Sequence, residues 1–181
     1  MTRPLLFPAI IALGLATQPA LALESDRNQP INISADALNI DESAGTAVYT
    51  GTVEVDQGSM QLRSQRVELE RGENGGLSRL TARDGDDGRA YVEQKPSPEE
   101  PLARGWGETI IYHAGERRVE LIGNAELHQS GDTFNGGYVE YFLDTRQINA
   151  RGSRSAESQE DDGGRVRMQL TPDNQQGSST Q

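Results

Sequence analysis

A two-residue alternation of apolar and polar side chains, running from residue 30 to residue 150, constrains the fold more than any other feature of the sequence. Ile31 and Ile33 alternate with polar residues, and Val53 and Val55 do the same further along. Successive side chains of a strand point to opposite faces, so each run predicts a strand with one apolar and one solvated face. Glycine-rich turns separate the runs at intervals of roughly 8–12 residues. We therefore expect an all-β sandwich, barrel or roll with almost no helix.

An internal repeat, which aligns Gly51 with Gly123, organises these predicted strands. Five residue types recur at this offset: Gly51, Glu54, Gln57, Val67 and Glu68 match Gly123, Glu126, Gln129, Val139 and Glu140. Six apolar positions also keep their phase: Leu38, Ile40, Tyr49, Val55, Leu62 and Leu69 meet Ile110, Tyr112, Leu121, Leu127, Phe134 and Tyr141. Two similar groups of strands would then wind one continuous roll. The alternative is that any two alternating runs align at some offset.

The N-terminal segment, from Met1 to Ala22, has the features of a secretory signal peptide. Arg3 gives a short positive region, the apolar stretch covers Leu5 to Ala16, and Ala20-Leu21-Ala22 forms a small-x-small cleavage site. This stretch is shorter than the roughly 20 apolar residues of a bilayer span, which favours cleavage over an uncleaved anchor. The chain has no Cys, so a cysteine-linked lipid and disulfides are excluded. We expect a soluble mature chain in the periplasm.

The predicted mature chain, from Leu23 to Gln181, is long enough to bury a core unaided. Hydrophobic residues make up only 34% of the whole chain, which favours a thin core with one wet face. Without Arg3 the chain has 16 basic and 28 acidic residues, a net charge of −12. A chain this acidic repels phosphate backbones and anionic bilayers at long range. We therefore expect no nucleic-acid partner, and an anionic amphiphile would be held mainly through its apolar part.

The pattern divides the chain into a few segments. The roll covers residues 23–152 and is followed by a polar linker, 153–164. A terminal edge strand is expected at 165–170, and the low-complexity tail, 171–181, is expected to be disordered. The stretch from Lys95 to Pro101 is typical of a loop.

The sequence contains no recognisable catalytic or metal-binding motif. His113 and His128 are its only histidines and lack metal-ligand spacing, which favours surface or hydrogen-bonded roles over zinc binding. The run from Asp84 to Gly88 lacks the spacing of an EF-hand and favours a turn over a calcium loop. Trp106 is the only tryptophan that could serve as a sugar platform, although paired carboxylates for glycoside hydrolysis are left open. We predict a chain that is not an enzyme and has no cofactor and no metal.

The two ends of a roll leave strand edges that can pair with other chains. The predicted partner edges are Ile31, Asn32, Ile33 and Ser34 at the start and Val166, Met168 and Leu170 at the end. Pairing the last strand of one copy with the first strand of the next is heterologous and would build a rod. The alternative is that loops cover both ends.

Five segments, in order and over nearly the whole mature chain, resemble the OstA-like family of periplasmic lipopolysaccharide-transport proteins: 26–36, 49–60, 119–127, 131–134 and 165–172. The resemblance implies a twisted antiparallel β-jellyroll, slightly open along one side, that holds the acyl chains of lipopolysaccharide (lipid A) in its interior. It also implies three partners: an inner-membrane jellyroll component of an ABC-transporter complex, the periplasmic domain of an outer-membrane translocon, and further copies of the chain, head to tail. The resemblance is weakest from Arg71 to Pro101.

The inward apolar residues form the predicted lipid-binding path, because they share one pleat phase and little apolar material is present to close the core. They are Ile31, Ile33, Leu38, Ile40, Tyr49, Val53, Val55, Leu62, Tyr91, Ile110, Tyr112, Leu121, Leu127 and Phe134. Plain core packing is the alternative at each position. For the whole chain, the alternatives are a periplasmic glycan-binding protein and a structural filament without lipid carriage. Within the family, the cleavable signal disfavours a membrane-anchored bridge component, and the absence of a barrel in the sequence pattern disfavours the translocon's periplasmic domain.

Overall fold

The structure is a computed structural model that describes residue 26 and residues 29–97, 99–153 and 164–171. The predicted signal peptide, residues 154–163 of the predicted linker and residues 172–181 of the predicted tail lie outside the described residues. No helix within the described part is both long and apolar enough to cross a membrane.

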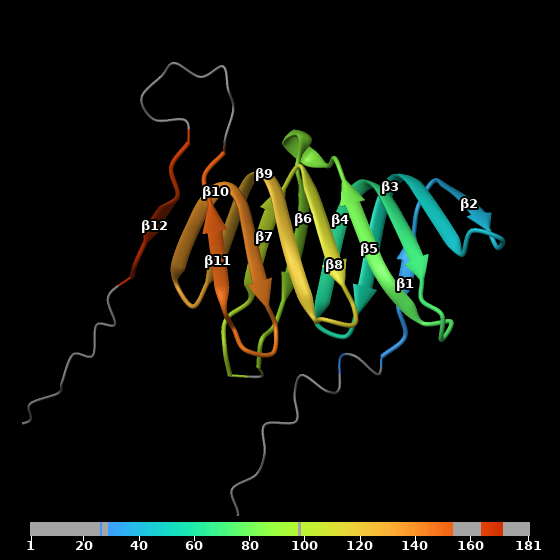
Figure 1. Cartoon of the computed structure of the whole chain (residues 1–181), viewed down its shortest axis with the longest axis horizontal. Coiled ribbons are helices and arrows are strands. Elements are labelled where there is room, and N and C mark those ends of the chain that lie inside the picture. The colour runs from blue at the N-terminus through green and yellow to red at the C-terminus, as the bar shows by residue number, and fades with distance from the viewer. Residues whose placement is uncertain (1–25, 27–28, 98, 154–163, 172–181) are drawn as a thin grey trace, which may run out of the picture.

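Nearly all the described regular structure is antiparallel β-strand, as the alternation predicted (Figure 1). The strands are β1 (Asn32–Ser34), β2 (Ala37–Asp41), β3 (Thr46–Gln57), β4 (Met60–Arg71), β5 (Leu77–Arg83), β6 (Ala90–Gln94), β7 (Ala103–Gly107), β8 (Thr109–His113), β9 (Arg118–Gln129), β10 (Asp132–Phe142), β11 (Ile148–Arg151) and β12 (Arg167–Gln169). One short 3-10 turn, η1 (Asp86–Gly88), lies where the sequence predicted a turn. β12 lies within the predicted terminal strand, 165–170, and is shorter than that range.

The four long strands each change partner near the middle, and this makes the sheet a roll. β4 pairs with β6 through residues 61–63 and with β5 through residues 66–71. β9 pairs with β8 and then with β7, β3 pairs with β2 and then with β1, and β10 pairs with β12 and then with β11. One set of strands, β2, β5, β8 and β11, therefore faces the other set, β1, β6, β7 and β12. The bent long strands close one edge of the roll.

The internal repeat is confirmed by the strand boundaries. When the sequence is shifted so that Gly51 falls on Gly123, β2 and β3 coincide with β8 and β9, and β1 and β4 overlap β7 and β10. The pairings repeat as well, because β3 joins β1, β2 and β4 as β9 joins β7, β8 and β10. The two halves meet where β5 pairs with β8 and β6 pairs with β7. The ends of the chain's roll, β1 with β2 and β11 with β12, lie at opposite ends of its long axis (Figure 1).

The core runs along this axis between the two facing sets of strands. The largest of its fully buried side chains are branched aliphatic ones: Val53, Val55, Val67, Leu80, Ile110, Leu121 and Val139. Along most strands, inward positions alternate with exposed or half-buried ones, so the other face of the strand contacts solvent. The core is thin, as the composition predicted, because one layer of side chains from each side fills it.

Candidate functional site

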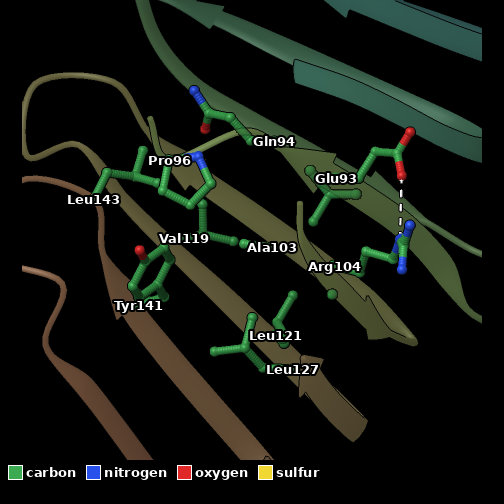
Figure 2. A pocket seen from close by; sticks show the side chains of 12 residues that line it. Glu93, Gln94, Pro96, Ala103, Arg104, Val119, Leu121, Leu127, Tyr141 and Leu143 are labelled. Atoms are coloured by element: carbon green, nitrogen blue, oxygen red, sulfur yellow. Dashed lines mark ion pairs between the residues drawn. The ribbon is translucent and has the colours of Figure 1, made fainter. Parts of the chain in front are cut away.

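The apolar interior contains two neighbouring cavities beside the edge of the roll that the bent strands do not close. Their volumes are about 40 and about 50 Å³. Val92, Gln94, Val119 and Leu143 line both cavities, so the two adjoin along the axis. Figure 2 shows the smaller one, with Gln94, Pro96 and Leu143 toward one side and Leu121 and Leu127 toward the other.

This unclosed edge, hereafter the open edge, lies between turns that belong to opposite sets of strands. Gln94 and Pro96, at the end of β6 and in the following loop, form one side. Arg117 and Leu143, in the turns before β9 and after β10, form the other side. An ion pair spans the edge, with Arg146 Nη1 2.5 Å from Glu100 Oε1.

A third hollow, of about 340 Å³, lies at the β1–β2 end of the roll. Its apolar lining comes from the first four strands and the start of β5: Ile31, Ile33, Ile40, Tyr49, Leu69 and Leu77. The three spaces therefore follow one another along the roll from the first strands to β10.

Most of the predicted lipid-path residues lie in or against the core. Six are buried: Val53, Val55, Leu62, Ile110, Leu121 and Leu127. Five more are half-buried and pack against the core: Ile31, Ile33, Tyr49, Tyr112 and Phe134. Their inward orientation is confirmed, whereas lipid contact stays a prediction.

Leu38 and Ile40, which were also predicted to be inward, are exposed in the structure. Their exposed fractions are 51% and 60%. Both residues still lie on the inner face of β2, since Leu38 is opposite Tyr49 and Ile40 lines the hollow at the β1–β2 end. β2 has β3 as its described neighbour, and within the described residues no strand lies beyond it to cover this face.

Tyr91 was predicted to be inward and instead lies on the outer face. Ala90, on the same strand, is fully buried and Val92 lines both cavities, so these two occupy the inner positions of β6. Tyr91 is opposite Trp106, with ring centroids 5.1 Å apart, and its hydroxyl donates to Glu93 Oε2 over 2.6 Å. Partial burial, together with Glu93, raises the pKa of Tyr91 to about 12.

Sequence reasoning missed several residues that line the cavities, notably Met60, Val92, Val119, Tyr141 and Leu143. The repeat was a usable signal for Tyr141, because that residue is the second half's equivalent of Leu69. Burial raises the pKa of Tyr141, so its hydroxyl stays protonated near neutral pH, and it accepts a 2.9 Å hydrogen bond from Gln129 Nε2. Leu143 and Met60 lie next to turns, where alternation carries no information.

The predicted partner edges lie at the two ends of the roll. Ile31 and Ile33 are half-buried, whereas Asn32 and Ser34 are exposed. Val166, Met168 and Leu170 are exposed by 41%, 52% and 63%. Apolar side chains are thus solvent-facing at both ends, at Leu38 and Ile40 on one and along the last strand on the other.

The two histidines are hydrogen-bonded surface residues, as expected. His113 Nε2 is 3.1 Å from Glu120 Oε1, and His128 Nε2 is 2.7 Å from Glu126 Oε1. Among the residues that the structure describes, no group of three or more His, Asp or Glu side chains could hold a metal ion.

An antiparallel jellyroll is the fold of a class of lipopolysaccharide-transport proteins. Residues 32–147 match the family described as "LptA/(LptD N-terminal domain) LPS transport protein", and the chain belongs to this family. The family is one of transport proteins, not of enzymes.

Named relatives agree with this assignment. The chain is 41% identical over 150 residues to the lipopolysaccharide export system protein LptH of Pseudomonas aeruginosa, covering 82% of each chain. It is 28% identical over 151 residues to the lipopolysaccharide export system protein LptA of Escherichia coli K12, covering 82% of this chain and 80% of that protein. The crystal structure of LptH, described as the LptA-homologous periplasmic component of the lipopolysaccharide transport device of P. aeruginosa, superposes with a TM-score of 0.71 at 35% identity. It covers 82% of this chain and 99% of LptH, so the predicted jellyroll and family are confirmed.

Proposed function

We propose that the mature chain carries lipopolysaccharide across the periplasm, with the acyl chains between the two sets of strands and the polar part outside the open edge. The observation that carries this proposal is the continuous apolar interior beside an unclosed edge, in a chain of the lipopolysaccharide-transport family. Each buried CH₂ group stabilises the complex by about 0.8 kcal/mol, so even partly buried acyl chains supply useful affinity. Cleavage of the signal peptide after Ala22 would release the chain into the periplasm.

The repeat supports a head-to-tail assembly of copies. β11 and β12 pair with β10 as β5 and β6 pair with β4, so they are the second half's equivalents of β5 and β6. β1 and β2 are likewise the equivalents of β7 and β8. A second copy can therefore continue the roll if its β2 pairs with β11 and its β1 pairs with β12, as β8 and β7 do within one chain.

This continuation also specifies a register. In the chain, Leu80 is opposite Tyr112 and Ala82 is opposite Ile110. The equivalent positions place Ile148 opposite Ile40, and Ala150 opposite Leu38, of the next copy. The same reasoning places Met168 opposite Ile33. Each of these apolar residues at the C-terminal end of one copy would then contact an apolar residue at the N-terminal end of the next copy.

The same two ends would join the chain to its partners in transport. We infer that β1 and β2 accept the inner-membrane jellyroll component of the transporter complex, and that β11 and β12 present lipid to the periplasmic domain of the outer-membrane translocon. Both contacts would extend the roll by strand addition, which uses backbone hydrogen bonds and so tolerates sequence differences between partners.

A pair of photo-crosslinking variants tests lipid carriage. Tyr112 and Tyr91 are each replaced by a photoreactive phenylalanine, because Tyr112 lines the interior and Tyr91 lies on the outer face. The variants are purified without detergent from a Gram-negative periplasm, irradiated, and analysed by mass spectrometry. We expect lipopolysaccharide adducts at position 112 and few at position 91. Equal labelling would place the lipid outside the interior, and lipid-free protein that takes up no added lipopolysaccharide would favour a filament or glycan-binding role.

A further inference from the structure

One basic residue lies at the border between the apolar interior and solvent. Arg117 belongs to the turn between β8 and β9 and adopts a left-handed conformation, with φ 49°. It is the only basic residue among the described residues that line the larger cavity, where its neighbours include Tyr112, Val119 and Leu143. Its side chain is only 11% exposed, so the guanidinium is held against the open edge and does not extend into solvent.

The guanidinium of Arg117 keeps most of its hydrogen-bonding capacity. Its Nε donates to Asp144 Oδ1, and the two terminal nitrogens donate to no other described residue. Asp144 is 63% exposed, so this counter-ion is hydrated and can be exchanged. The turn itself is fixed separately, because the backbone N–H of Leu143 donates to the carbonyl oxygen of Arg117 over 2.9 Å.

We propose that Arg117 binds a phosphate group of the carried lipid at the open edge, an inference that rests on the proposed lipid carriage. An arginine fork matches the oxygens of a phosphate in a bidentate manner, and the bond is stronger where water is partly excluded. The chain has a net charge of −11, so its long-range field repels an anionic lipid and a local cation is needed to hold the head group. Asp26 is the only acidic residue among the described lining of this cavity, and its carboxylate accepts a hydrogen bond from Ser59 Oγ. The ion-pair partner of Arg117 is Asp144 and not Asp26.

Arg146 provides a matched control for Arg117. It lies in the turn after β10 that also contains Asp144, and it pairs with a carboxylate, that of Glu100. It lines neither interior cavity. A loss of charge at residue 146 therefore changes the net charge of the protein equally without touching the proposed phosphate site.

The test compares the full mature protein and its variants for binding of bisphosphorylated lipid A, of the same lipid with both phosphates removed, and of inorganic phosphate. We expect the wild type to bind the phosphorylated lipid about tenfold more tightly than the phosphate-free lipid, from one charge-assisted contact. R117Q should lose that preference, and R146Q should keep it. Inorganic phosphate alone should not bind measurably, because the acyl chains supply most of the affinity.

A second variant keeps the proposal falsifiable if R117Q does not fold. Asp144→Asn leaves Arg117 in place and removes its counter-ion, so it should bind phosphorylated lipid several-fold more tightly than the wild type and leave phosphate-free lipid unaffected. A phosphate preference that persists in R117Q, or tight binding of inorganic phosphate alone, would overturn the assignment of a lipid phosphate to Arg117. A wild type that binds neither lipid would instead overturn lipid carriage.

Discussion

Gly51 and Gly123 show how single residues bend the long strands of the roll. Each has a left-handed backbone, with φ 98° and 74° respectively, and each lies where its strand changes partner. The Asp36 carboxylate lies against Gly51 and accepts a 3.1 Å hydrogen bond from the next backbone N–H, and Glu108 lies in the same way against Gly123. A glycine with an acidic side chain over it therefore recurs once in each half.

Gly51→Ala should lower the free energy of unfolding by about 2–4 kcal/mol, because the new Cβ would overlap Asp36 and the backbone angle is strained for any L residue. Gly75→Ala is the matched control, since Gly75 has φ 78° and open space around its Cβ position. Urea denaturation of both variants measures the difference. Adding Asp36→Gly to Gly51→Ala removes both the Cβ and the carboxylate that the new Cβ meets, so it should restore part of the loss that exceeds that of Gly75→Ala. No recovery would mean that the Asp36 side chain is not the obstacle.

The alternation pattern predicted correctly which face of its strand most residues occupy. It failed where both faces of a strand carry apolar or aromatic side chains. On β6, Ala90 and Val92 point inward and Tyr91 points outward, so Tyr91 does not share the pleat phase on which its inward prediction rested. Its cross-strand contact with Trp106 depends on the pairing of β6 with β7, which no local pattern encodes. Alternation also gives no information about Arg117, the proposed phosphate ligand, because a turn residue has no phase.

At the scale of the strands, the repeat made the strand boundaries predictable. It did not predict whether the strands at the two ends of the roll are covered by a neighbour. The offset that aligns Gly51 with Gly123 gives β2 and β3 the same boundaries as β8 and β9, since equal spacing of turns produces equal strands. Exposure of Leu38 and Ile40 was not predictable, because the same apolar pattern in Ile110 and Tyr112 is covered by β5. Whether a strand is covered depends on its neighbour in the sheet.

The proposed register between copies can be checked with a pair of cysteines in a chain that has none. Residues directly opposite in antiparallel strands have Cα atoms about 4.5–5.5 Å apart, within the range of a disulfide. The variant Ile40→Cys with Ile148→Cys should therefore form a ladder of covalent oligomers under mild oxidation, seen on a non-reducing gel. Asn39→Cys with Ile148→Cys is the control, because residue 39 points to the other face of β2. Equal ladders from both variants would contradict the register.

At the scale of the whole roll, the two interior cavities of the described part enclose less space than a lipid requires. Cavities of about 40 and about 50 Å³ hold only a few water-sized groups, so an acyl chain cannot occupy them as they stand. The sequence predicted a thin core and an open side, but not how far the side chains fill the interior, because that depends on the separation of the two sets of strands. Small residues such as Ala103 and Gly105 face the smaller cavity, where Leu121 packs close to Gly105. The proposed lipid carriage therefore requires the two sides to separate at the open edge during loading.

The ion pair between Glu100 and Arg146 provides the place to test this separation. The pair is partly exposed, so its own contribution to stability is only about 0–1 kcal/mol and does not hold the edge shut. Cysteines at these two positions, joined by a short bifunctional thiol reagent, would tie the two sides together covalently. We expect the cross-linked protein to load lipopolysaccharide at least about tenfold more slowly than the uncross-linked variant, because the acyl chains must pass between the joined turns. Protein cross-linked after loading should retain its lipid.

The matched control cross-links Glu70 and Arg79, whose ion pair of 3.2 Å joins the neighbouring strands β4 and β5 and does not span the open edge. In this control, the rate of loading should be unchanged. The rate is measured from the fluorescence of a labelled lipopolysaccharide. If the variant tied across the edge loads as fast as the control, the acyl chains do not enter between the turns of the open edge.

The acyl chains would then have to enter along the axis from the β1–β2 end, where the hollow of about 340 Å³ is already open. The pair of variants thus separates lateral entry from end-to-end transfer, because an edge tie blocks the first and leaves the second intact.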